Sequence, residues 1–225
     1  MAQAPEVLIQ GVVHKLAVSF VRPHFSVLLP LVCTMGEAMF GIAGKDFVLM
    51  AADMHSAFSI CRLKDDTDKI WEIEKMLFAA AGPNSDTTNF VEFIDKNIRL
   101  HTLRTGLPLT VKAAANFTRM ELASALRRKP YQVDMLIGGH DSKGPALYFM
   151  DYLSSMEKVN KAAHGYGAYF ALSIMDRYYK PDLTVEEGKD IIRKCIKEME
   201  TRFVMHLAKF KVKIVDAAGI REIEL

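Results

Sequence analysis

Short apolar runs open the regular part of the chain and predict strands. Four strands are predicted first, at 38–43, 47–53, 69–73 and 76–81. The turn-forming triplet Gly44-Lys45-Asp46 separates the first two and indicates a hairpin. Consecutive apolar residues fill 47–52, so both faces of the second strand are expected to be covered.

Two helices are predicted next, because apolar residues then recur at helical spacing. Phe90, Ile94 and Ile98 lie four positions apart and mark the buried face of the first helix. Ser85 or Asp86 can cap its start, and a glycine and a proline soon after it end it. The second helix is predicted to begin after Thr110, with inward-facing residues Val111, Ala114, Ala115, Leu122 and Leu126.

The second half of the chain repeats this order of strands, helices and strands. Strands are predicted at 131–138, 146–152 and 157–163, helices at 168–179 and 184–203, and closing strands at 210–215 and 220–225. Thr184 and Glu187 form a capping-box pattern at the start of the last helix. The alternation of apolar residues and lysines along 210–215 predicts a strand with one solvated face.

This order of elements indicates an α+β fold. Two sheets packed face to face, each with a helix pair on its outer side, would bury every apolar face described above. A four-layer αββα sandwich is therefore the predicted architecture, although periodicity alone does not distinguish it from other layered α+β folds.

Composition is that of an ordinary globular protein. Half of the residues are apolar, a quarter are charged and the formal net charge is +2, so nothing in the charge favours nucleic acid or a membrane as a partner. Cys33, Cys61 and Cys195 are odd in number and widely spaced, which indicates reduced thiols, a cytoplasmic and nuclear location and no metal site. The basic run Arg127-Arg128-Lys129 is predicted to complete the C-terminus of a helix.

Residues 1–35 differ from the rest of the chain. The stretch 16–33 is apolar but broken by arginine, histidine and prolines, and its uninterrupted part is too short to span a bilayer. We predict an N-terminal extension at 1–35 and one domain at 36–225. The extension is expected to be either propeptide-like or non-native sequence upstream of a true start at Met35.

Three charged residues stand at equal spacing, with Asp53 sixteen positions after Glu37 and sixteen before Lys69. Read alone, Asp53 is a carboxylate that ends a strand and Lys69 is a surface lysine in a charged run. With the segments 36–53 and 69–73 around them, they resemble the start of mature proteasome β subunits. Further segments are similar to a non-catalytic branch of that family: Asn116–Arg119, Gly144–Tyr148, Met150–Tyr152, Ala163–Gly167 and Asp176–Tyr179.

The resemblance implies the four-layer N-terminal nucleophile hydrolase fold and a site that lacks its nucleophile. In catalytic members a threonine stands where this chain has Glu37, and it becomes the N-terminus and attacks the peptide carbonyl. An aspartate and a lysine assist at the positions of Asp53 and Lys69. At this spacing we expect Lys69 to face inward and to form a buried, structural ion pair with Asp53. Gly82 matches the glycine whose backbone N–H donates to the oxyanion, and Tyr166 replaces an assisting serine. No catalytic residue is therefore expected, and the vestigial positions are Glu37, Asp53, Lys69, Gly82 and Tyr166.

The chemistry of the family explains why this replacement matters. A threonine hydroxyl needs a base, which in these enzymes is the chain's own α-amino group, with a pKa of about 7.7–8.0. Glu37 has no hydroxyl. Thr34 lies three residues earlier, roughly 10 Å away along a strand and on its opposite face. The resemblance also implies a loss at 202–206, which lacks the aspartate and serine of active members.

The expected function is that of a non-catalytic β subunit of the 20S proteasome. It would complete the β ring and support neighbouring threonine-protease subunits in ubiquitin-dependent and other protein degradation. The implied partners are other β subunits, the α ring and, through the complex, protein substrates, and no cofactor or metal is implied. Two alternatives remain open, an active threonine peptidase processed at Thr34 and a scaffold of a non-proteasomal assembly.

Overall fold

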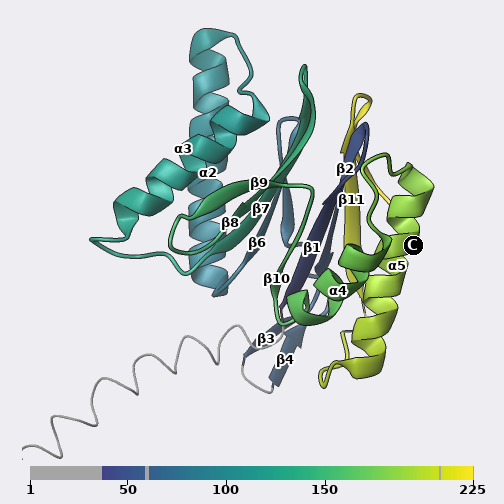
Figure 1. The fold of residues 1–225 in the computed structure, drawn as a ribbon. Helices are drawn as coiled ribbons and strands as arrows, with labels where there is room; N and C mark the ends of the chain where they lie inside the picture. The colour runs from purple at the N-terminus through teal and green to yellow at the C-terminus, as the bar shows by residue number, and fades with distance from the viewer. Residues whose placement is uncertain (1–36, 59–60, 208, 225) are drawn as a thin grey trace, which may run out of the picture.

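The computed structural model describes residues 37–58, 61–207 and 209–224. The extension predicted at 1–35, with Thr34 and Met35, lies outside the described residues. The described chain forms four layers, in which two sheets are packed face to face between two helix pairs (Figure 1). The predicted α+β sandwich is confirmed.

One sheet contains the first and the last described strands. Its order is β10-β1-β2-β11-β12, and all its neighbouring strands are antiparallel. The bounds are Ala38–Ala43 for β1, Phe47–Asp53 for β2, Lys161–Gly165 for β10, Phe210–Asp216 for β11 and Gly219–Glu222 for β12. β1 and β2 match the prediction residue for residue, and every residue in them is buried.

The other sheet has the order β5-β6-β7-β8-β9 and is also antiparallel. Its strands are β5 at Ile70–Ile73, β6 at Met76–Ala81, β7 at Asp134–Asp141, β8 at Gly144–Met150 and β9 at Met156–Val159. A separate hairpin of β3 (Ser56–Phe58) and β4 (Cys61–Lys64) was not predicted. Its strands are short and β4 is exposed throughout, so no apolar pattern marks it.

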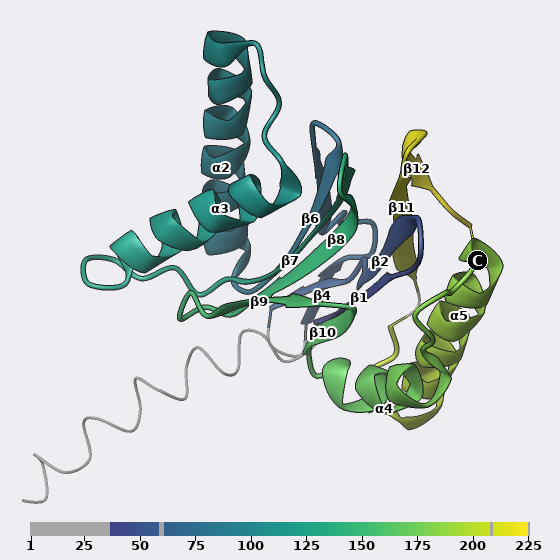
Figure 2. The same ribbon diagram turned by 45° about the horizontal axis from the view of Figure 1, so that its top comes forward.

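The helix pairs cover the outer faces of the sheets (Figure 2). α2 (Asn84–Thr105) and α3 (Val111–Ala125) lie on the β5–β9 sheet, whereas α4 (Ala168–Tyr178) and α5 (Val185–Arg202) lie on the other. Gly106 ends α2 in the left-handed conformation, and Thr184 forms the predicted capping box of α5. The predicted cap of α2 is wrong, because Pro83 occupies its N-cap.

Three apolar cores hold the layers together. Phe90 belongs to the core under α2 and α3, and Ile192 to the core under α4 and α5. The third core lies between the two sheets. β2 serves two of them, since Leu49 faces the helices and Met50 faces the opposite sheet. This double burial explains its uninterrupted apolar run.

Two strand predictions need correction. The segment 157–163 was predicted as one strand, but β9 pairs with β8 in one sheet and β10 pairs with β1 in the other. The chain crosses from one sheet to the other at this point. The apolar pattern does not show which strand each half pairs with, so it could not reveal the crossing. The strand at 210–215 was predicted to have a solvated face, yet Lys213 is buried in β11.

The basic run at Arg127 to Lys129 also lies elsewhere than predicted. α3 ends at Ala125, and its last turn contains no basic residue. The run follows the helix in a turn that leads toward β7, and its three side chains are exposed.

Candidate functional site

Neighbouring strand ends bring the equally spaced charges together. Glu37 directly precedes β1, Asp53 ends β2, and Lys69 directly precedes β5 in the facing sheet. Asp53 Oδ1 accepts a hydrogen bond of 2.8 Å from the backbone N–H of Ala38, which fixes the carboxylate beside the start of β1. The two sheets therefore meet at this point through charged side chains.

Asp53 and Lys69 form the buried ion pair that their spacing predicted. Lys69 Nζ lies 2.8 Å from Asp53 Oδ2, and the side chains are 6% and 1% exposed. The same oxygen accepts a bond of 3.2 Å from the backbone N–H of His55. Each charge is thus neutralised and hydrogen-bonded, as burial requires.

The Glu37 carboxylate completes this cluster from the other side. Its Oε1 lies 3.8 Å from Lys69 Nζ. Its Oε2 accepts a hydrogen bond of 2.6 Å from the backbone N–H of Gly82. Burial raises the pKa of Glu37 from 4.5 to about 7, and the Lys69 ammonium and the Gly82 N–H oppose the rise.

Gly82 is held in a conformation that favours glycine. Its φ is +142°, and a Cβ built there would lie 2.1 Å from the carbonyl oxygen of Gln132. The backbone N–H of Gly82 is therefore fixed by the turn that follows β6. The one acceptor that it meets among the described side chains is the Glu37 carboxylate.

The turn at Gly165-Tyr166-Gly167 contacts the backbone of Glu37 rather than its carboxylate. Ala38 is paired with Gly165, and a Cβ on this glycine would lie 2.1 Å from the Glu37 carbonyl oxygen. The ring of Tyr166 packs 6.5 Å, centroid to centroid, from the ring of Phe203, just after α5. Tyr166 is therefore part of an aromatic contact beside the site.

A cavity of about 280 Å³ opens beside Glu37 and Lys69. Sequence reasoning did not identify its other polar lining residues, Ser56, Lys64, Thr67, Asn84, Thr87 and Thr88. Asn84 Nδ2 donates to Ser56 Oγ at 3.0 Å, which ties the start of α2 to β3. These residues come from the unpredicted hairpin, the loop after it and the start of a helix, so no periodic signal could have singled them out.

The chemistry available in the cluster is limited. An ammonium group, two carboxylates and a backbone donor meet there, and Glu37 brings no hydroxyl to the cluster. Within 37–58, 61–207 and 209–224, no cluster of histidine, cysteine, aspartate or glutamate is arranged to hold a metal ion. Nor is any helix in these ranges long and apolar enough to span a bilayer.

Comparison with known proteins agrees with the geometry. The family model for proteasome subunits matches residues 33–215. The chain is 46% identical over 188 residues to proteasome subunit beta type-2 of Oryza sativa, covering 83% of this chain and 89% of that protein. It is 42% identical over 193 residues to a probable proteasome subunit beta type-4 of Schizosaccharomyces pombe, covering 84% and 100%. The Saccharomyces cerevisiae beta type-4 subunit is 39% identical over 192 residues, covering 84% and 97%. The chain therefore belongs to the proteasome subunit family.

Proposed function

We propose that this chain is a non-catalytic β subunit of the 20S proteasome core, corresponding to the type-2 subunit at the fourth position of the β ring. The names of its relatives support this assignment, since they are type-2 and type-4 β subunits matched over nearly their whole length. The subunit completes the ring and supports the neighbouring threonine-protease subunits in protein degradation.

The hydrogen bond from Gly82 to Glu37 carries the proposal that the subunit is inactive. An acyl-transfer site needs a nucleophile and a free donor for the oxyanion that forms on the substrate. Here a carboxylate stands in place of the nucleophile, and it accepts the N–H that the oxyanion would need, at 2.6 Å. A substrate carbonyl would have to displace the Glu37 side chain from the Gly82 N–H.

The partners follow from membership of a multi-subunit family. Proteasome subunits assemble with one another, and we propose that this chain contacts other β subunits within its ring and the α ring on one side. Protein substrates reach it only through the complex. We propose a cytoplasmic and nuclear location for the particle, in keeping with the cysteine pattern.

Processing at Thr34 is the competing function. A threonine there would have to replace Glu37 beside Asp53 and Lys69, although it lies three residues earlier in the chain. We regard this alternative, and a scaffold outside the proteasome, as outcomes of the test below.

The test is isolation of the particle through an affinity tag on this chain, followed by native mass spectrometry and determination of the mature N-terminus. We expect a 20S-sized particle with one type of β subunit per ring position and no chain that begins at Thr34. With the active subunits of the particle inactivated, peptide turnover should stay at background. Turnover that disappears in the Thr34→Ala variant would overturn the proposal, and a particle without proteasome subunits would favour the scaffold.

A further inference from the structure

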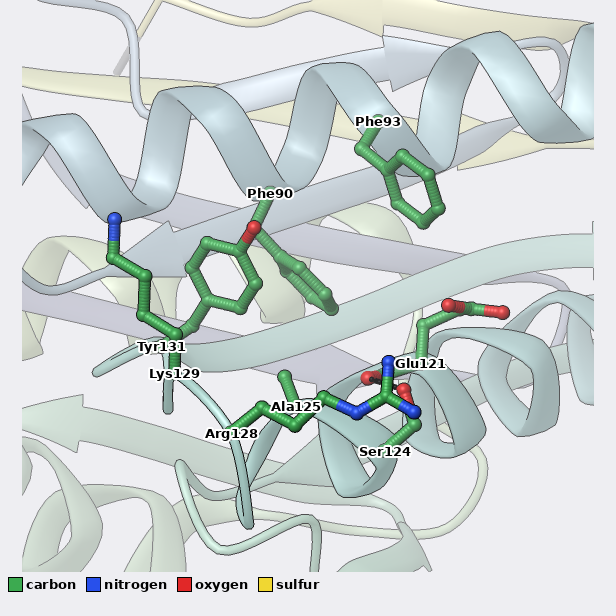
Figure 3. Close-up of a pocket in the computed structure, with 8 residues that line it drawn as sticks. All are labelled: Phe90, Phe93, Glu121, Ser124, Ala125, Arg128, Lys129 and Tyr131. Carbon is green, nitrogen blue, oxygen red and sulfur yellow. Dashed lines mark hydrogen bonds between the residues drawn. The ribbon is translucent and has the colours of Figure 1, made fainter.

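A pocket lies on the outer helix layer, far along the chain from the Glu37 cluster. Its volume is about 260 Å³, and it lies between α2, the end of α3 and the segment that leads into β7. Figure 3 shows Phe90 and Phe93 projecting from α2, with Tyr131, Arg128 and Lys129 from that segment around them. The pocket therefore joins an apolar floor to a basic rim.

The floor is aromatic and preformed. Phe90 is buried, and its ring packs 5.2 Å, centroid to centroid, from that of Tyr131. Phe93, one turn along α2, is 45% exposed. Large apolar side chains next to rigid aromatic rings are the usual anchors of protein interfaces.

The rim has unmatched positive charge. Arg128 and Lys129 line the pocket, and Arg127 adjoins them, whereas Glu121 is the one acidic side chain in the lining. None of the ion pairs formed by the described side chains involves these three cations. On α2, by contrast, the exposed Lys96 and Arg99 pair with Glu92 and Asp95, one turn away. The basic run is thus available to pair with acidic side chains of another chain.

The size of the pocket favours a side chain as its occupant. Pockets for small molecules are commonly about 300–1,000 Å³, and this one falls below that range. It has room for one large apolar side chain, and the cations stand where acidic neighbours of that side chain would reach them.

We propose that this pocket docks a segment of a neighbouring subunit in which a large apolar residue is flanked by aspartate or glutamate. The proposal rests on the proposed function, because it takes the partner to be part of the same particle. The aromatic floor buries the anchor, and Arg128 and Lys129 select the acidic flanks and fix the register. The basic run has no role in the Glu37 cluster, and this contact assigns it one.

Competition for assembly tests the proposal. Differently tagged wild-type and variant chains are co-expressed, and mass spectrometry measures the ratio of the two in purified particles. Reversing both rim charges, Arg128→Glu with Lys129→Glu, should lower incorporation by about tenfold or more, because like charges across an interface repel each other. The matched control is Lys112→Glu with Arg119→Glu, two exposed cations on α3 outside the pocket. The control should change incorporation less than about twofold. Equal loss in both double variants, or loss in neither, would overturn the proposal.

A second variant separates the pocket from its charge, and a cross-link identifies the partner. Ala125→Trp fills the pocket without changing charge and should also lower incorporation.

A photoreactive residue in place of Phe93 should cross-link, in the assembled particle, to a peptide with an apolar residue beside aspartate or glutamate. A cross-linked peptide without acidic residues would contradict the proposal. If the wild-type chain itself enters no proteasome particle, the proposed function fails instead.

Discussion

Two buried lysines lie close to β5 and face different partners. Lys69 precedes the strand, and its Nζ lies 2.8 Å from Asp53, whose side chain is 1% exposed. Lys213 comes from β11 in the opposite sheet, and its Nζ lies 2.8 Å from Asp68 and 2.9 Å from Glu72, which are 42% and 50% exposed. It also donates to the carbonyl oxygen of Ile70 at 2.7 Å.

The comparison shows two ways to place an ammonium group between packed sheets. Asp53 has no access to water, so the charge of Lys69 is neutralised by an equally buried carboxylate. The carboxylates that meet Lys213 keep contact with solvent, so each can exist without the lysine. The first arrangement fails when either member is lost, whereas the second tolerates the loss of one partner.

The largest effect is expected from Lys69→Ala. This change leaves the Asp53 carboxylate buried and unpaired, which typically costs about 3–5 kcal/mol of unfolding free energy. Urea denaturation of the full chain would measure the loss, and incorporation into particles should fall with it. Lys64→Ala, an exposed lysine of β4, is the control and should change little. Normal stability of Lys69→Ala would mean that the pair is not buried in solution.

The next largest effect is expected from the titration of Glu37, which makes the free energy of unfolding depend on pH. The folded pKa of about 7 exceeds the reference value of 4.5, so the folded state binds an additional proton between these values. The resulting stability is present below pH 4.5 and is lost as pH rises to about 7. The unfolding free energy of the wild type, minus that of Glu37→Gln, should therefore fall by about 3 kcal/mol as pH rises across that window.

Denaturant titrations of both chains at a series of pH values would measure this difference. An exposed apolar substitution, Leu63→Ala, provides a reference that removes no titrating group. A difference between wild type and Glu37→Gln that stays constant across the window would show that the Glu37 carboxyl is solvated rather than buried, because burial is what raises its pKa.

Lys213→Ala should cost less than Lys69→Ala. The half-exposed carboxylates of Asp68 and Glu72 regain water, and the main loss is the hydrogen bond to Ile70. We expect about 1–3 kcal/mol. Lys211→Ala, on the same strand, is the control. A loss equal to that of Lys69→Ala in the same urea assay would erase the distinction between the two lysines.

The smallest effect is expected from Glu72→Gln. Its side chain is 50% exposed, and Lys213 retains Asp68 as a partner. Ion pairs with this exposure contribute up to about 1 kcal/mol. A thermal melt of the full chain should show a shift of a few degrees at most. A loss comparable with that of Lys69→Ala would show that the Glu72 carboxylate is desolvated in the folded chain.

The two lysines also mark how far the sequence could be interpreted. The Asp53–Lys69 pair was predictable, because both residues lie at ends of strands that apolar runs identify and at a spacing characteristic of a family. Lys213 was not, since its partners lie about 140 residues earlier and the alternation along β11 looks the same whether its polar face meets water or carboxylates. The contact between Glu37 and Gly82 joins the residue before β1 to the turn after β6, 45 positions later in the chain, and no periodic pattern reveals such a contact.

Activity of a Glu37→Thr variant tests the central claim most directly, namely that this cluster stabilises the fold and does not support catalysis. The variant is assembled into particles whose native active subunits are all inactivated, and basic, acidic and apolar reporter peptides are assayed. We predict no turnover above background, because the family resemblance implies that polar groups of active members are missing at Tyr166 and in the 202–206 segment. Such groups commonly supply factors of roughly 10²–10³ each. Turnover above background, with a mature N-terminus at residue 37, would contradict the account.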